Sequence, residues 1–114
     1  MISKKYRISH QEEYQELYKK GKKFTGKYII VYIKGNNLHH NRFGIVVSKK
    51  VGNAVIRNRA KRQIRAVIQE INRGMIGSND MVVIAKSNIS KSSYCVIKKD
   101  FCGILRKAGL CSEN

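Results

Sequence analysis

Basic residues in the middle of the chain recur at the spacing of a helix face. At about 100° per residue, Arg57, Lys61 and Arg65 lie along one edge of a predicted helix. Arginine side chains bind phosphate groups in a bidentate manner, and asparagine can add hydrogen bonds to a sugar or a base. The predicted chemistry is binding of nucleic-acid phosphates, and the candidate residues are Lys49, Lys50, Asn53, Arg57, Asn58, Arg59, Lys61, Arg62 and Arg65.

The distribution of charge supports this interpretation. The chain has 24 Lys and Arg against 7 Asp and Glu, a formal net charge of +17. No acidic residue occurs between Leu17 and Gln69, where 14 of the basic residues fall. A merely solvated basic face is the alternative, but solvated faces normally mix both signs. An excess of this size attracts polyanions, and the expected partner is RNA.

Residue types that support catalysis by protein side chains are sparse. His10, His39 and His40 have no cysteine or carboxylate at ligand spacing, and a solvated loop is expected for the last two. Cys95 and Cys102 are expected on one helix face against the core, with no base for a thiol nucleophile. No carboxylate pair and no nucleotide-binding loop motif is present. The sequence therefore predicts no catalytic residue, no metal site and no small-molecule substrate for the protein itself.

Length and composition limit the architecture and the compartment. The 114 residues, 42% of them hydrophobic, predict a single folded domain spanning residues 1–114. No apolar run approaches the roughly 18 residues of a membrane span, and no signal segment precedes the domain, so no membrane partner is expected. The chain has three cysteines, including Cys111 in the tail, and this odd number argues against a disulfide framework. A reducing, cytoplasmic location is predicted.

The periodicity of apolar residues predicts how these side chains are positioned. Ser9 and Glu12 predict a capping box at the start of the first helix. The second predicted strand is expected to pair antiparallel with the first. The element order α-β-β-α-β-α predicts an α/β (α+β) two-layer sandwich around a small mixed sheet. The expected helices are 10–20, 53 or 54 to 72, and 93–108, and the expected strands are 28–34, 43–48 and 81–86.

The long helix and the first strand each have defined apolar faces. Ile29, Val31 and Ile33 alternate with Tyr28, Ile30 and Tyr32, which predicts a central strand covered on both sides. Tyr14 and Tyr18 of the first helix could converge with Ile30 and Tyr32 to give aromatic surface for stacking unpaired bases. The alternative is that this tyrosine stripe belongs to the core. The core face of the long helix is predicted to comprise Ile56, Ala60, Ile64, Val67, Ile68 and Ile71.

The basic segment also resembles a known family. Residues 44–55, Gly-Ile-Val-Val-Ser-Lys-Lys-Val-Gly-Asn-Ala-Val, followed by Arg57-Asn58-Arg59, resemble the signature of the bacterial ribonuclease P protein subunit. The resemblance extends to residues 14–21, 28–33 and 105–110 and covers nearly the whole chain. The chain departs from the family at Tyr14 and Tyr18, where phenylalanine is frequent, and at Ala60 and Gln63, where larger aliphatic residues are common.

This resemblance implies a division of labour with RNA. In the family, the RNA subunit is the catalyst and holds most of the Mg²⁺ that directs water at the bond joining the 5′ leader to the mature tRNA. The implied roles are binding of ribonuclease P RNA by the Arg57-Asn58-Arg59 helix and binding of the precursor tRNA leader by a cleft of Tyr14, Tyr18, Ile30 and Tyr32. The implied fold is that of the second domain of ribosomal protein S5, with a left-handed β-α-β crossover.

Two other function classes fit the charge and size. A ribosomal or other structural RNA-binding protein would share the basic helix but would not discriminate precursor tRNA from mature tRNA. An autonomous protein ribonuclease would cut RNA without an RNA subunit.

Overall fold

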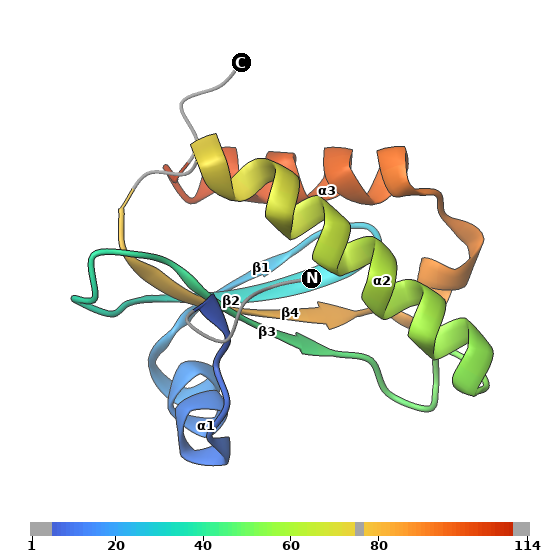
Figure 1. Ribbon diagram of the computed structural model, residues 1–114, viewed down its shortest axis with the longest axis horizontal. Coiled ribbons are helices and arrows are strands. Elements are labelled where there is room, and N and C mark those ends of the chain that lie inside the picture. Colours follow the sequence, from blue (N-terminus) through green and yellow to red (C-terminus); the bar gives the residue numbers. More distant parts are fainter. Residues whose placement is uncertain (1–5, 75–76, 111–114) are drawn as a thin grey trace.

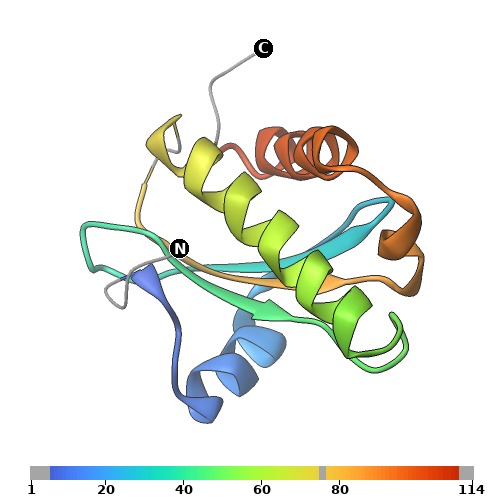
Figure 2. The ribbon, with the colours of Figure 1, turned by 45° about the vertical axis from the view of Figure 1, so that its right-hand side comes forward.

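The computed structural model describes residues 6–74 and 77–110, which form a four-stranded mixed sheet with helices on both faces (Figure 1). Helices α2 and α3 cover one face and α1 lies against the other, as the turned view in Figure 2 also shows. The predicted mixed α+β architecture is confirmed. The elements are α1 (Gln11–Lys20), β1 (Lys22–Thr25), β2 (Ile29–Gly35), β3 (Arg42–Val46), α2 (Ala54–Ile71), η2 (Asn72–Gly74), β4 (Asn79–Ala85), η3 (Ser87–Lys91) and α3 (Tyr94–Lys107).

The order of the strands is β1-β2-β4-β3, which differs from the predicted pairing. β4 lies between β2 and β3, antiparallel to the first and parallel to the second, so the predicted direct pairing of β2 with β3 is wrong. Met81, Val82 and Val83 of β4 are fully buried, and a strand that is apolar on both faces belongs in the centre of a sheet. The β3–α2–β4 unit is the crossover that the resemblance implied, and its left-handed sense stays a prediction.

The sequence analysis did not predict β1. It is a short edge strand that pairs antiparallel with β2, with Phe24 opposite Val31. Lys22 and Lys23 give it no apolar alternation, and edge strands are often short and charged. β2 is therefore central, as predicted, with β1 on one side and β4 on the other.

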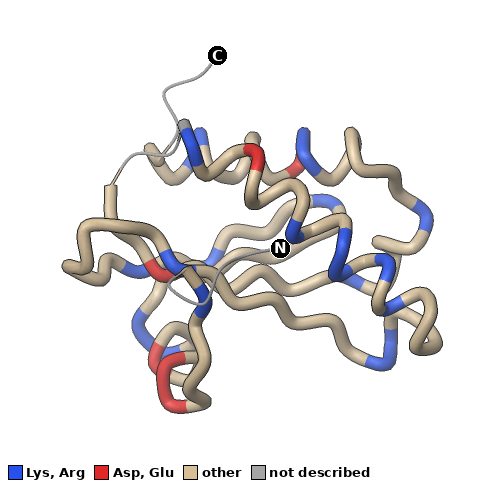
Figure 3. The backbone as a smooth tube through the Cα atoms, in the orientation of Figure 1, with Lys and Arg blue, Asp and Glu red and all other residues tan. Residues whose placement is uncertain are grey.

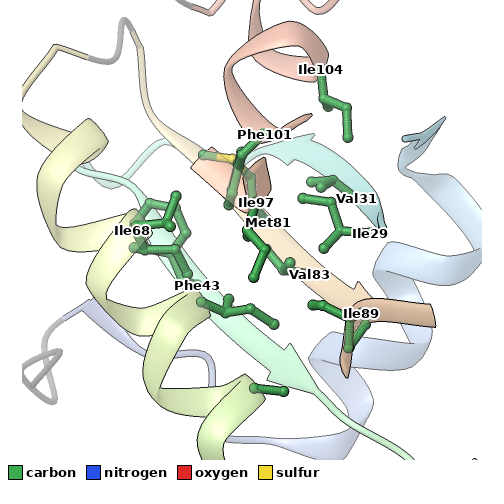
Figure 4. Packing of buried hydrophobic residues seen from close by; sticks show 14 of the residues in the cluster. Ile29, Val31, Phe43, Ile68, Met81, Val83, Ile89, Ile97, Phe101 and Ile104 are labelled. Atoms are coloured by element: carbon green, nitrogen blue, oxygen red, sulfur yellow. The ribbon is translucent and has the colours of Figure 1, made fainter. Parts of the chain in front are cut away.

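The main hydrophobic core lies between the sheet and the helices α2 and α3 (Figure 4). Val31 and Val83 from the sheet face Ile68 of α2 and Phe101 of α3, and all four are buried. The predicted core face of α2 is confirmed, because Ala60, Ile64, Val67 and Ile68 are buried while Ile56 and Ile71 pack at the margin. This backing places the opposite face of α2 at the surface.

A second, smaller cluster holds α1 on the other face of the sheet. Its buried members are Ile8, Leu17 and Val82. The helix starts one residue later than its predicted capping box, because His10 is the N-cap and its N–H donates to Glu13 Oε1 at 3.3 Å. Ser9 therefore does not have the predicted capping role.

The two cysteines of α3 do not share a core-facing position. Seven residues apart, the two cysteines lie on one side of the helix as predicted, but Cys95 is exposed and Cys102 is half-buried, so the prediction that this side packs against the core is wrong. Ile97 and Phe101 form the core face instead, and Cys95 lies about 200° from Ile97 around the helix. Cys111 lies outside the described residues. No described helix has the length and apolarity needed to cross a membrane.

Candidate nucleic-acid interface

The N-terminal end of α2 is fixed by a turn and a helix cap. Val51 N–H donates to Ser48 O at 3.1 Å and Gly52 N–H to Lys49 O at 3.2 Å, which leaves Lys49 and Lys50 exposed at the turn. Gly52 has φ +154°, and a Cβ there would lie 3.0 Å from the Ile56 side chain. The Asn53 side chain caps the helix by accepting from Ile56 N–H at 3.0 Å. Asn53 therefore has a structural role besides the predicted contact with RNA.

Basic positions follow one another along α2, which Figure 3 marks on the backbone. Asn58, Arg59 and Arg62 are exposed. Arg57, Lys61 and Arg65 are half-buried, which fits their position at the edge of the core face. The Nε of Arg57 is buried without a hydrogen-bond partner among the described residues. We call the set Lys49, Lys50, Arg57, Asn58, Arg59, Lys61, Arg62 and Arg65 the basic face.

The acidic residues that form ion pairs or side-chain hydrogen bonds in the described part of the chain do so away from the basic residues of α2. Glu16 pairs with Lys34 at 3.1 Å, and Glu70 pairs with Lys98. Asp100 accepts hydrogen bonds from the backbone N–H groups of Lys27 and Tyr28 at 2.9 and 2.8 Å. Across residues 6–74 and 77–110, no ion pair involves the basic face. Its positive charge is therefore left for a polyanion.

An ion-pair network ties the start of α1 to the sheet. Arg42 Nη2 lies 2.8 Å from Glu13 Oε2 and 2.7 Å from Asp80 Oδ2, and Arg42 Nε donates to Asp80 Oδ1 at 2.9 Å. Asn36 Nδ2 also donates to Asp80 Oδ1, at 2.8 Å. Burial acts to raise the pKa of Asp80, but the hydrogen bonds from Arg42 and Asn36 hold this pKa below its usual value. The network fixes α1 beside the open part of the sheet face.

Two of the four residues predicted to line an aromatic cleft are in contact. The rings of Tyr18 and Tyr32 make an edge-to-face contact with centroids 5.0 Å apart, and Tyr18 is 41% exposed. Burial, followed by the nearby Tyr32, raises the pKa of Tyr18. Ile30 lies on the same face of β2 as Tyr32 and is half-buried. Tyr32, like Tyr14, packs against the second hydrophobic cluster, which fits the core alternative for these two rings. The role of the four residues as a cleft for the leader stays a prediction.

Tyr14, one helix turn before Tyr18, lies against β3. Its Oη donates to Ile8 O at 3.2 Å, and a Cβ built at Gly44 would lie 2.5 Å from this Oη. The glycine therefore lets the tyrosine ring approach the strand backbone. Burial, followed by the neighbouring Tyr18, raises the pKa of the half-buried Tyr14. Of the four predicted cleft residues, Tyr14 is the most closely integrated into the fold.

Two apolar residues that the sequence analysis did not assign to the cleft lie beside Ile30. Ile84 pairs with Ile30 across β2 and β4, and Val46 pairs with Ile84 across β3 and β4. All three are half-buried and form one cross-strand row on the face that α1 only partly covers. Strand alternation alone could have assigned them to faces, but the row depends on the position of β4 between β2 and β3.

The two histidines of the loop after β2 differ in exposure. His39 is exposed, as predicted, whereas His40 is half-buried with its ring 5.3 Å from that of Tyr6, edge to face. Within the described part of the chain, no three His, Cys, Asp or Glu side chains are grouped so as to hold a metal ion.

Comparison with known proteins identifies relatives over the whole length. The family model described as Ribonuclease P matches residues 2–109. The ribonuclease P protein component of Syntrophomonas wolfei is 43% identical over 114 residues, covering 100% of this chain and 96% of that protein. The corresponding component of a Geobacillus strain is 37% identical over 109 residues, covering 95% and 94%.

Solved structures agree with the sequence matches. The RNase P protein of Staphylococcus aureus superposes with a TM-score of 0.84 at 33% identity, covering 94% of this chain and 98% of that one. The RNase P protein of Thermotoga maritima gives 0.81 at 25% identity, covering 89% and 96%. These matches do not favour a ribosomal or other structural RNA-binding protein. With the unpaired basic face on α2 and the matching fold, they show that the chain belongs to the bacterial ribonuclease P protein family.

Proposed function

We propose that this chain, as the protein component of the ribonucleoprotein endoribonuclease, binds ribonuclease P RNA through the basic face of α2. The observation that carries the proposal is that these cations stand on a helix whose other side is buried, with no acidic partner in the described residues. A face held rigidly by its core can meet successive phosphates without reorganisation. The family membership supports an RNA partner.

The second part of the proposal concerns the precursor tRNA. Tyr18, Tyr32 and the row of Ile30, Ile84 and Val46 offer aromatic and apolar surface beside α1. Bases of an unpaired strand can stack on such surface, whereas bases within a duplex cannot reach it. The 5′ leader is unpaired and is absent from mature tRNA, so this cleft favours precursor over product. Tyr14 contributes at its edge.

The protein positions its substrate in this proposal and the RNA subunit cleaves it. Mg²⁺, held mainly by the RNA, supplies the activated water when bound. The described residues do not form a metal-ligand group of their own, so no step is assigned to a protein-held ion. The proposed compartment is the cytoplasm, because an odd number of three cysteines, with no disulfide at Cys95 or Cys102, suits a reducing environment.

Reconstitution tests the proposal directly. The chain is combined with a bacterial ribonuclease P RNA, and cleavage and affinity are measured with precursor and mature tRNA. We expect leader removal to require the RNA subunit, and the protein to increase affinity for precursor more than for mature tRNA. Cleavage by the protein alone would favour the autonomous ribonuclease. Equal affinity gains for the two tRNAs would contradict the cleft assignment.

A further inference from the structure

A cavity of about 350 Å³ lies where the two proposed RNA surfaces meet. Tyr14 of α1 and Arg65 of α2 both line it, although the sequence assigned them to different surfaces. The segment before α1 contributes Arg7 and Ser9, and the edge strand β3 contributes Ile45. The cavity therefore joins the α1 side of the sheet to the α2 side around the free edge of β3.

The cavity exists because the edge of β3 is only partly covered. Arg7 forms a parallel bridge with Phe43, and Ile8 N–H donates to Phe43 O at 2.9 Å. In a strand, alternate residues direct their N–H and C=O groups to the same edge. The next residue on this edge is Ile45, and the segment turns into α1 before reaching it. The backbone of Ile45 therefore borders the cavity.

The charges that border the cavity have one sign. Arg7 is exposed and Arg65 is half-buried, and no acidic side chain lines the cavity. Among the described residues, neither arginine takes part in an ion pair. Two guanidinium groups, with the Ser9 hydroxyl nearby, suit a phosphate.

The remaining walls are apolar and firm. Ile8 and Phe43 are 4% and 2% exposed, and Tyr14 is held by its bond to Ile8 O and by its close approach to Gly44. The volume is at the lower end of ligand pockets, which run from about 300 Å³ upward. It suits a single nucleotide better than a stacked pair.

We propose that this cavity binds one unpaired nucleotide of an RNA strand, with its phosphate between Arg7 and Arg65 and its base or ribose against Tyr14 and Ile45. The inference rests on the proposed function, because the strand is the one that passes from the α1 side to α2. It adds a nucleotide subsite and assigns Arg7, which lies outside the basic helix, to RNA binding.

The first test measures binding of a short unpaired oligouridine to the full chain by fluorescence anisotropy. Arg7→Gln should weaken binding about tenfold, the loss expected for a charge-assisted hydrogen bond. The matched control is Arg106→Gln, which removes the same charge from an exposed site on α3. The control should stay within about twofold of wild type, because a distant exposed charge is screened by salt. Equal losses in the two variants would overturn the proposal.

A double-mutant cycle tests whether the two arginines hold one phosphate. The combined loss in Arg7→Gln with Arg65→Gln should be clearly smaller than the product of the single losses. Independent, multiplicative losses would show that they contact separate phosphates. That result would contradict the shared site.

The second test uses the wild-type chain and does not depend on a variant that folds. Uridine 5′-monophosphate, uridine and inorganic phosphate are titrated separately, and the Ile45 amide and Arg65 side-chain resonances are followed by NMR. Uridine 5′-monophosphate should shift the resonances of both residues at a lower concentration than uridine or inorganic phosphate does. An equal response to phosphate alone would reduce the cavity to an anion site, and no response would rule out the nucleotide.

These tests also separate this inference from the proposed function. If wild type and Arg106→Gln fail to bind ribonuclease P RNA, the proposed function is wrong, whatever the mononucleotide titration shows. If both bind that RNA while Arg7→Gln matches the control and the titration is silent, only the cavity assignment is wrong.

Discussion

The two faces of the sheet use charge in opposite ways. On the α1 face, Glu13 and Glu16 meet Arg42 and Lys34, so opposite charges pair within the fold. On the α2 face, Glu70 pairs with Lys98 of α3, but the cations of the basic face have no acidic partner among the described residues. Paired charges position a helix, whereas unpaired charges attract a ligand.

The faces also differ in the amount of core behind them. The α2 and α3 side contains the main cluster, from Ile29 of β2 to Leu105 of α3, whereas the cluster on the α1 side has three buried members among the described residues, Ile8, Leu17 and Val82. The cations of the basic face repel one another, which destabilises the fold. The free energy gained by burying the apolar side chains of the large core outweighs this repulsion. The small α1 cluster is supplemented by the ion-pair network around Arg42. We infer that α1 is the more weakly held helix.

The largest expected effect tests this difference in packing. Phe101→Ala should lower the free energy of unfolding by about 3–5 kcal/mol, the usual range for a fully buried phenylalanine. Leu17→Ala, on the α1 side, should cost about 2–3 kcal/mol, because a small cluster near the surface can relax around the gap. Urea unfolding followed by circular dichroism measures both. A Leu17→Ala cost equal to that of Phe101→Ala would show that α1 is as firmly packed as the main core.

The second prediction concerns the α2 face. Arg62→Ala should weaken assembly with ribonuclease P RNA by about 1–3 kcal/mol, since a charge-assisted hydrogen bond to phosphate is lost. Arg62 is exposed, so the free energy of unfolding should stay within about 0.5 kcal/mol of wild type. Filter binding at several salt concentrations gives the affinity, and Arg106→Ala is the control.

The salt series also reports on the whole basic face. If it neutralises about six phosphates, log K should fall with log[salt] at a slope of about −4 to −5. A slope shallower than about −2 would mean that this face is not the main docking surface.

The third prediction concerns the α1 face. In the reconstituted particle, Tyr18→Ala should weaken the binding of precursor tRNA relative to that of mature tRNA by about 1–3 kcal/mol, the contribution of one base stack. Assembly with the RNA subunit should hardly change, because Tyr18 lies on the opposite side of the sheet from the basic face. Tyr94→Ala, on α3, is a matched tyrosine control. If the folded Tyr18 variant keeps the wild-type ratio of precursor to mature affinity, the cleft assignment is wrong.

The buried faces of α2 and β2 were predictable from the sequence, because the spacing of apolar residues indicates which side of a helix or strand is buried. The helix from Ala54 to Ile71 and its core face followed from apolar spacing alone. The alternation in β2 likewise separated Ile29 and Val31 from Ile30 and Tyr32. Such patterns describe an element and its own faces.

What failed depends on contacts between distant segments. The insertion of β4 between β2 and β3 cannot be inferred from strand patterns, because each strand is apolar enough to be central. The row of Val46 and Ile84 beside Ile30 follows from that insertion. Arg7 had no periodic signal, since its position depends on one bridge to Phe43. Asp80 was likewise an isolated acid in the sequence, yet it pairs with Arg42 of β3.

The smallest expected effect comes from Asp80, and it tests whether charge pairing supports the α1 side. Its hydrogen bonds with Arg42 and Asn36 hold its pKa below the usual value of 3.8 despite burial. A carboxyl group with a lowered pKa in the folded state stabilises the fold above its unfolded pKa, and this contribution is lost as pH falls through the folded value. Asp80→Asn should therefore be less stable than wild type by about 1 kcal/mol at neutral pH. The difference should shrink as pH falls below about 4. Urea unfolding at neutral and acidic pH measures it, with Glu12→Gln as a control at an exposed acid. A difference that stays constant with pH would assign the effect to packing instead of charge, and α1 would then be held in the same way as α2.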